Sequence, residues 1–106
     1  MGEIEELKAE IRKFADARDW EIFHTPKNLS MAIAGEAGEL VAEFQWLTAD
    51  ESAKNSLSEA QKIAIGLEVA DVAIYLLRLA DVLGINLEEV VRAKLKINEG
   101  RFPTQD

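Results

Sequence analysis

Four carboxylates in the sequence stand in two pairs with the same spacing. Glu36 and Glu39 form the first pair, in "GEAGE", and Glu68 and Asp71 form the second, in "EVAD". Residues three apart are neighbours on a helix surface, so each helical pair presents two carboxylates together. An all-oxygen ligand set suits Mg²⁺, with Mn²⁺ as a substitute, whereas iron and zinc sites usually include histidine or cysteine. The pairs therefore predict a divalent-cation site.

The second pair lies inside an apolar run, residues 63–85. An unpaired buried carboxylate destabilises a protein strongly, so Glu68 and Asp71 need partners. One alternative is a structural salt bridge to Arg78 or to a basic residue of the first helix. The other is a cation held between two helices. Small residues flank the first pair and indicate that a backbone or a ligand approaches closely there: Ala32, Gly35, Gly38 and Ala42.

Four helices and no strand are expected to position these carboxylates, in a compact antiparallel bundle with short connections. Local signals mark the helix starts: Thr25 before Pro26, Ser58 with Gln61, and Asn86 with Glu89. Gly84 and Gly100 are expected to end the last two helices. The expected spans are about 4–18, 26–47, 58–83 and 86–99.

Composition narrows the class of protein. The 106 residues predict a single domain, 1–106, and the net charge of −8 argues against nucleic-acid or anionic-membrane binding. The absence of cysteine excludes thiolate sites and fits a cytoplasmic protein. The acidic beginning of the chain does not read as a secretory signal, and the charges within residues 63–85 argue against a membrane span.

Basic and aromatic residues suggest which kind of ligand would bind together with the cation. Lys94, Asn98 and Arg101 share one helical face if the last turn persists, and could bind phosphates. A solvated face with cations near a helix C-terminus is the simpler alternative. The aromatic residues Trp20, Phe23 and Trp46 suit either the core or the walls of a base pocket.

Three blocks of the sequence, in order, and a signature within them resemble a known family. They are "RDWEIFHTPKNLSMAIAGEAGELVAEFQW", "EVADVAIYLLRLAD" and "KLKINEGRFP", together with the Glu-x-x-Glu…Glu-x-x-Asp signature that runs through them. They are similar to the MazG-like, all-α nucleoside triphosphate pyrophosphohydrolases, and within these to the dCTP-pyrophosphatase branch. Phe102 stands where other members have tyrosine, so a role that needs that hydroxyl is not expected here.

The resemblance implies a fold, an activity and an assembly. The fold is a four-helix MazG-like bundle assembled as an oligomer, with a homotetramer (a dimer of dimers) favoured. The activity is Mg²⁺-dependent hydrolysis of a nucleoside triphosphate to a monophosphate and pyrophosphate, serving nucleotide-pool house-cleaning, with dCTP-like substrates favoured. By position, the metal ligands would be Glu36, Glu39, Glu68 and Asp71; the phosphate-binding residues Lys94, Asn98 and Arg101; and the base and sugar pocket Trp20, His24, Asn28, Trp46 and Tyr75.

Cleaving a phosphoanhydride also needs an activated water, which a carboxylate beside the metal could supply. We assign that role to Glu39, although any of the four carboxylates could serve. A non-catalytic helical oligomerisation or partner-binding module is the competing hypothesis, because an apolar helix in a subunit interface needs no chemistry.

Overall fold

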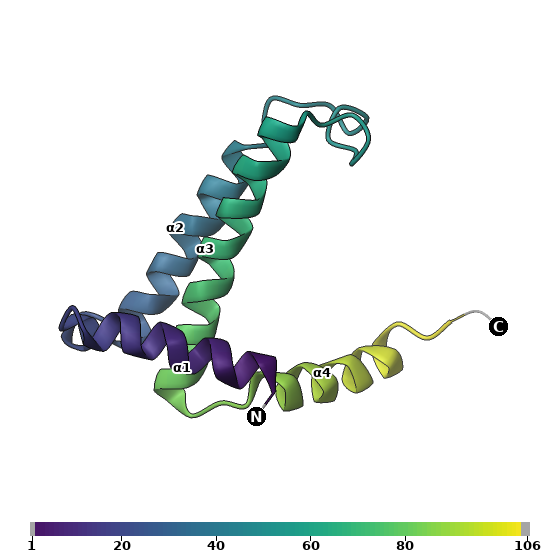
Figure 1. Cartoon of the computed structure of the whole chain (residues 1–106). Coiled ribbons are helices and arrows are strands. Elements are labelled where there is room, and N and C mark those ends of the chain that lie inside the picture. The colour runs from purple at the N-terminus through teal and green to yellow at the C-terminus, as the bar shows by residue number, and fades with distance from the viewer. Residues whose placement is uncertain (1, 105–106) are drawn as a thin grey trace.

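The described residues of this computed structural model, 2–104, form helices and no strand. The all-α class and the number of long helices are therefore confirmed. The elements, labelled in Figure 1 except for the short 3₁₀ turn η1, are α1 (Glu3–Asp16), η1 (Trp20–Ile22), α2 (Pro26–Ala42), α3 (Glu59–Leu83) and α4 (Leu87–Arg101).

Short-range capping sets the helix starts, as predicted. The Thr25 and Asn86 side chains accept hydrogen bonds from backbone amides three residues on, at 3.2 and 3.1 Å. Ser58 and Gln61 form a reciprocal capping box, with bonds of 3.1 and 2.8 Å. Gly84 ends α3 in the left-handed conformation, with φ +67°, which glycine adopts without a Cβ clash.

The end of α2 was predicted wrongly: the helix stops at Ala42 rather than near Leu47. Beyond it the backbone tightens, and the Phe44 amide bonds to a carbonyl three residues back, at 2.9 Å. Thr48 and Glu51 then cap each other reciprocally, with bonds of 2.8 and 3.2 Å between side chain and amide. This Thr-x-x-Glu pattern favours a new turn over further helix.

The core lies where three helices meet. α2 and α3 run antiparallel, side by side, and α1 packs across the C-terminal part of α3 (Figure 1). Leu29 of α2 is 1% exposed, and Ala15 of α1 and Ala80 of α3 are also buried. The Arg12 guanidinium holds α1 to α3 through two bonds to the Asp81 carboxylate, 2.8 and 2.6 Å long.

α4 stands apart, so the expectation of a compact antiparallel bundle is wrong for the single chain. α4 projects away from the α2–α3 hairpin (Figure 1). The radius of gyration is 16.8 Å, against about 13 Å for a compact chain of this length. A short connection allows a helix to continue outward as readily as to fold back. Apolar side chains such as Leu67 and Leu95 consequently stay more than half exposed.

The corner between α1 and η1 depends on one backbone angle. Asp19 is the only non-glycine residue within residues 2–104 with positive φ, +56°. Aspartate tolerates this left-handed conformation better than most residues. The corner lets Trp20 pack edge-on against Phe14, with ring centroids 5.6 Å apart. None of the helices within the described part is long and apolar enough to cross a membrane.

Candidate metal and nucleotide site

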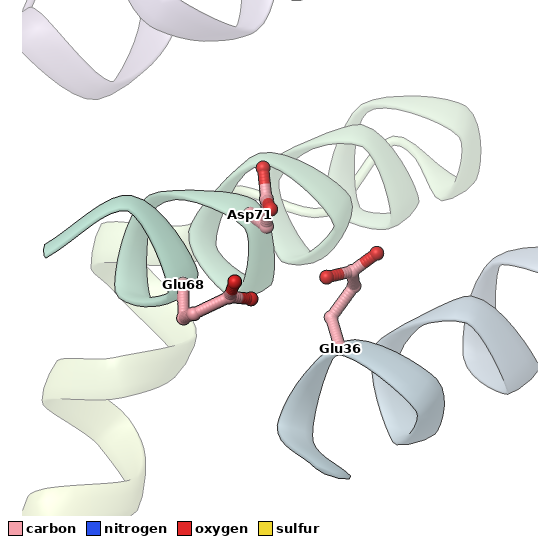
Figure 2. Close-up of side chains that lie close together, drawn as sticks. All are labelled: Glu36, Glu68 and Asp71. Atoms are coloured by element: carbon pink, nitrogen blue, oxygen red, sulfur yellow. The ribbon is translucent and has the colours of Figure 1, made fainter. Parts of the chain in front are cut away.

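Three of the four predicted carboxylates meet between α2 and α3. Glu36, Glu68 and Asp71 each offer one oxygen, and these oxygens lie within 4.8 Å of one another. Figure 2 shows Glu36 reaching from α2 toward the two carboxylates of α3. The antiparallel pairing of the helices thus brings both sequence pairs to the same place. We call these three residues the carboxylate cluster.

Glu39 lies one turn beyond Glu36 on α2, is exposed, and is not part of the cluster. It is nevertheless near. The pKa of Glu68 is raised above its ordinary value, first by burial and then by the neighbouring carboxylates, Glu39 among them. The cluster is therefore a place where negative charge repels negative charge.

The structural salt bridge considered from the sequence is not formed. Within residues 2–104, no lysine or arginine lies within 4.0 Å of the carboxylates of Glu36, Glu39, Glu68 or Asp71. Arg78, the named candidate, pairs with Asp81 instead, at 3.2 Å. A bound cation would relieve the repulsion that the protein leaves uncompensated.

The donor set fits a hard divalent cation. Its atoms are carboxylate oxygens, which Mg²⁺ and Mn²⁺ prefer. The chain has no cysteine, and its only histidine, His24, is not part of the cluster. Zinc and iron sites built on nitrogen or sulfur ligands are therefore disfavoured. Gly35 and Gly38 nearby face open space, since an added Cβ would meet nothing within 4 Å. Of the two approaches predicted at these glycines, the approach of another backbone is not made within residues 2–104, and the approach of a ligand stays a prediction.

An aromatic hollow of about 330 Å³ lies beside η1. It brings together four of the five residues predicted for the base and sugar pocket. Trp46, the fifth, is outside it, in the connection after α2, and is 88% exposed. The lining residues are Trp20, Phe23, His24, Asn28, Leu29, Ala32 and Tyr75. We call this the aromatic hollow.

A second hollow, of about 250 Å³, lies beside the aromatic hollow and is bordered by α1 and α3. It shares Trp20, His24 and Tyr75 with the first and is also lined by Asp71. Asp71 thus belongs both to the lining of an apolar, ring-sized space and to a group of carboxylate oxygens that could hold a cation. That combination suits a ligand with a flat ring at one end and negative charge at the other.

The predicted phosphate-binding residues lie elsewhere. Lys94, Asn98 and Arg101 belong to α4. Gly100 does not end this helix as expected, since the helix continues through Arg101, and the last turn persists as the shared face required. The structure does not bring this face to the carboxylate cluster within one chain, because α4 projects away from the hairpin (Figure 1).

One residue beside the hollows has a place that the sequence did not reveal. Arg78 is only 5% exposed, and its Nε donates to His24 Nδ1 at 3.0 Å. Its charge is balanced by Asp81, whose pKa is held below its ordinary value, chiefly by the hydrogen bonds from Arg12. An arginine within an apolar run was the available signal. By its spacing Arg78 shares a helical face with Glu68 and Asp71, and spacing along one helix does not reveal a partner from another segment.

The fold and the site together define a class. An all-helical chain with paired carboxylates on two antiparallel helices matches the MazG-like family over residues 31–106, and the chain belongs to that family.

Individual proteins with known names are also similar to this chain. The chain is 40% identical over 100 residues to dCTP pyrophosphatase 1 of Homo sapiens, and 37% identical to that of Bos taurus. Those 100 residues are 94% of this chain and 59% of each relative, so the chain spans about three-fifths of their length. A solved pyrophosphatase from Archaeoglobus fulgidus is 41% identical, with a TM-score of 0.88, covering 98% of this chain and 95% of that one.

Proposed function

We propose that the chain is a Mg²⁺-dependent nucleoside triphosphate pyrophosphohydrolase that acts on deoxynucleotides, with dCTP-like substrates favoured. The observation that carries the proposal is the carboxylate cluster beside the aromatic hollow. The names of the relatives support both the reaction and the base. Removal of unwanted nucleotides from the cellular pool is the role such an activity would serve, and the lack of cysteine supports a cytoplasmic setting.

Each group has a task in the proposed reaction. A Mg²⁺ ion held by the carboxylate cluster would neutralise charge on the phosphates. Trp20 and Tyr75 line the hollow that would hold the base. Lys94 and Arg101 would bind phosphate oxygens as cationic donors.

We assign the activation of water to Glu39. It is exposed, so water reaches it, and it lies close enough to the cluster to affect Glu68. Its carboxylate takes a proton from water while the water oxygen bonds to the α-phosphorus. The bond from the α-phosphorus to the bridging oxygen breaks, and its electron pair leaves with pyrophosphate. Hydrolysis in ¹⁸O-water should therefore label the monophosphate, and label in pyrophosphate would contradict attack at the α-phosphorus.

The separation of α4 from the cluster supports a site shared between copies of the chain. We propose a homo-oligomer, with a tetramer favoured, in which α4 of one copy serves the hairpin of another. The exposed apolar side chains of α3 and α4 supply surface for such contacts. Sedimentation analysis tests the assembly, and a monomer at micromolar concentration would contradict it.

One experiment tests the function directly. Pyrophosphate release from a panel of nucleoside triphosphates, measured with Mg²⁺ and with EDTA, should show turnover that EDTA abolishes. Mg²⁺ with a non-hydrolysable dCTP analogue should also raise the melting temperature, because a ligand at a hundred times its Kd stabilises the folded state by about 2.7 kcal/mol.

The exposed apolar surface of α3 and α4 also suits a non-catalytic oligomerisation module. That alternative predicts no effect of Mg²⁺ on melting and a more stable protein when Glu68 is replaced by leucine, because a repelled carboxylate is removed. The proposed enzyme should instead lose turnover in Glu68→Leu.

A further inference from the structure

His24 is held in a defined way beside the aromatic hollow. It is half-buried after η1, lines both hollows, and contacts Trp20 edge-on, with ring centroids 6.0 Å apart. Arg78 reaches it from α3 and donates from Nε to the ring nitrogen Nδ1, at 3.0 Å. Two segments 54 residues apart thus meet at one imidazole.

The hydrogen bond fixes the form of the ring. A guanidinium has donors and no acceptor, so the Nδ1 of His24 must offer a lone pair to Arg78. A neutral imidazole with a lone pair on Nδ1 carries its proton on Nε2. Burial, and then the charge of Arg78, lower the pKa of His24, which favours this neutral ring over the imidazolium.

Arg78 is itself held from the other side. Its Nη1 donates to Asp81 Oδ2 at 3.2 Å, and Arg12 of α1 binds both oxygens of the same carboxylate. The guanidinium is therefore charge-balanced and oriented while 5% exposed. Within residues 2–104, the Nε2 of His24 forms no hydrogen bond to a protein group, so its N–H is available.

We propose that Arg78 is a positioning residue that presents the Nε2–H of His24 as a hydrogen-bond donor to an acceptor on the bound nucleobase. The acceptor is a carbonyl oxygen or an unprotonated ring nitrogen. This inference rests on the proposed function, because it takes the aromatic hollow as the base pocket. Beside it, Asn28 donates from Nδ2 to the Phe23 carbonyl at 3.0 Å, which leaves its Oδ1 as an acceptor on the same wall.

The tautomer can be measured without any substrate. His24 is the only histidine, so two-bond ¹⁵N–¹H spectra of the full ¹⁵N-labelled chain report on it alone. The wild-type chain should show the proton on Nε2 at neutral pH. Arg78→Met should give a mixture of tautomers, whereas Lys62→Met, a control on the same helix with an exposed partner, should leave the pattern unchanged. A wild-type proton on Nδ1 would overturn the proposal.

Kinetics test whether the donor reaches the base. Arg78→Met should raise KM for dCTP about three- to tenfold and change kcat less than twofold, because a base contact contributes equally in ground and transition states. His24→Gln places an amide N–H near the position of Nε2 and does not need Arg78 to set a tautomer. In that background, Arg78→Met should change KM less than twofold.

A merely structural Arg78 would raise KM equally in both backgrounds, and that result would overturn the proposal. Arg78→Lys keeps a cation for Asp81 and serves if Arg78→Met does not fold; it should shift the tautomer and KM in the same directions, by less. If the wild-type chain turns over dCTP and the Arg78 substitutions leave KM unchanged, this inference alone is overturned. A wild-type chain that releases no pyrophosphate from any nucleoside triphosphate would overturn the proposed function, and the nucleobase acceptor with it.

Discussion

The α2–α3 hairpin and α4 are both helical, yet they are supported differently. The hairpin buries Leu29, is braced by α1 and carries the carboxylate cluster. α4 contains no fully buried residue and carries Lys94, Asn98 and Arg101 on an outlying helix. The proposed cation site thus rests on packing inside one chain, whereas the proposed phosphate-binding role depends on where α4 is placed. Substitutions in the two regions should therefore fail in different ways.

The largest contrast should appear in stability. Leu29→Ala should lower the free energy of unfolding by about 3–5 kcal/mol, because it leaves a cavity in the packed region. Leu95→Ala on α4, where the side chain is 57% exposed, should cost less than about 0.5 kcal/mol in dilute protein. Urea unfolding at two protein concentrations measures both, and the Leu95 effect should grow with concentration if α4 packs between copies. Equal losses of unfolding free energy in the two variants would contradict the proposed difference between the hairpin and α4.

Next in size is the loss of chemistry in the hairpin. Asp71→Asn should reduce pyrophosphate release about 10²–10³-fold, because it removes a charge that the proposed cation needs. Without metal, its melting temperature should stay level or rise, since repulsion with Glu68 is removed. Glu59→Gln, at an 85% exposed carboxylate of the same helix, is the matched control and should turn over normally. Loss of fold with activity intact in the folded fraction would refute a metal role for Asp71.

A smaller effect is expected on α4. Lys94→Met should raise KM about tenfold with no change in melting temperature, because one cationic contact to phosphate is lost from an exposed helix. Lys96, also exposed but off the shared face, is the control, and Lys96→Met should leave KM unchanged.

A mixing experiment then tests which chain α4 serves. Asp71→Asn chains and Lys94→Met/Arg101→Met chains are dissociated together, reassembled and assayed below KM. Recovery above the mean of the two variants would show hairpin and α4 acting across copies. Activity at the mean in mixed assemblies would place the whole site in one chain.

The smallest expected effect is a pH dependence of the free energy of unfolding that arises from His24. The folded state lowers the pKa of His24, so the unfolded chain binds that proton more readily. The free energy of unfolding should therefore be level above about pH 6.5 and fall as pH is lowered from there through the pKa of the folded state. His24→Gln should lack this component when both are measured by urea unfolding from pH 5 to 8. An identical pH profile for both proteins would contradict it.

The local parts of this fold could be predicted because their causes are local. Helix starts follow from caps such as Ser58 with Gln61, and the three-residue spacing of Glu68 and Asp71 puts both on one face of α3. The early end of α2 does not follow from the sequence pattern, because the apolar residues continue past Ala42. The reciprocal hydrogen bonds of Thr48 and Glu51 become visible only in the structure.

The distant parts could not be predicted from spacing. A helix wheel shows that Arg78 and Glu68 share a stripe, but not that His24, 54 residues from Arg78, takes the hydrogen bond. Periodicity likewise shows that α4 has apolar residues without showing which chain covers them. Sequence patterns show whether a helix face is apolar or charged, whereas tertiary and quaternary contacts decide which segment or which subunit packs against that face.

The left-handed corner at Asp19 has a consequence for how such a pocket can change over evolutionary time. Its φ of +56° turns the chain so that Trp20 packs on Phe14 and forms one wall of both hollows. Asp19 itself lines neither hollow. A substitution there would re-aim the indole through the backbone, altering which ring shapes are accepted while every contacting side chain keeps its identity. If the hollows hold a base, as proposed, selection for a new base can act at a position that comparisons of pocket residues would overlook.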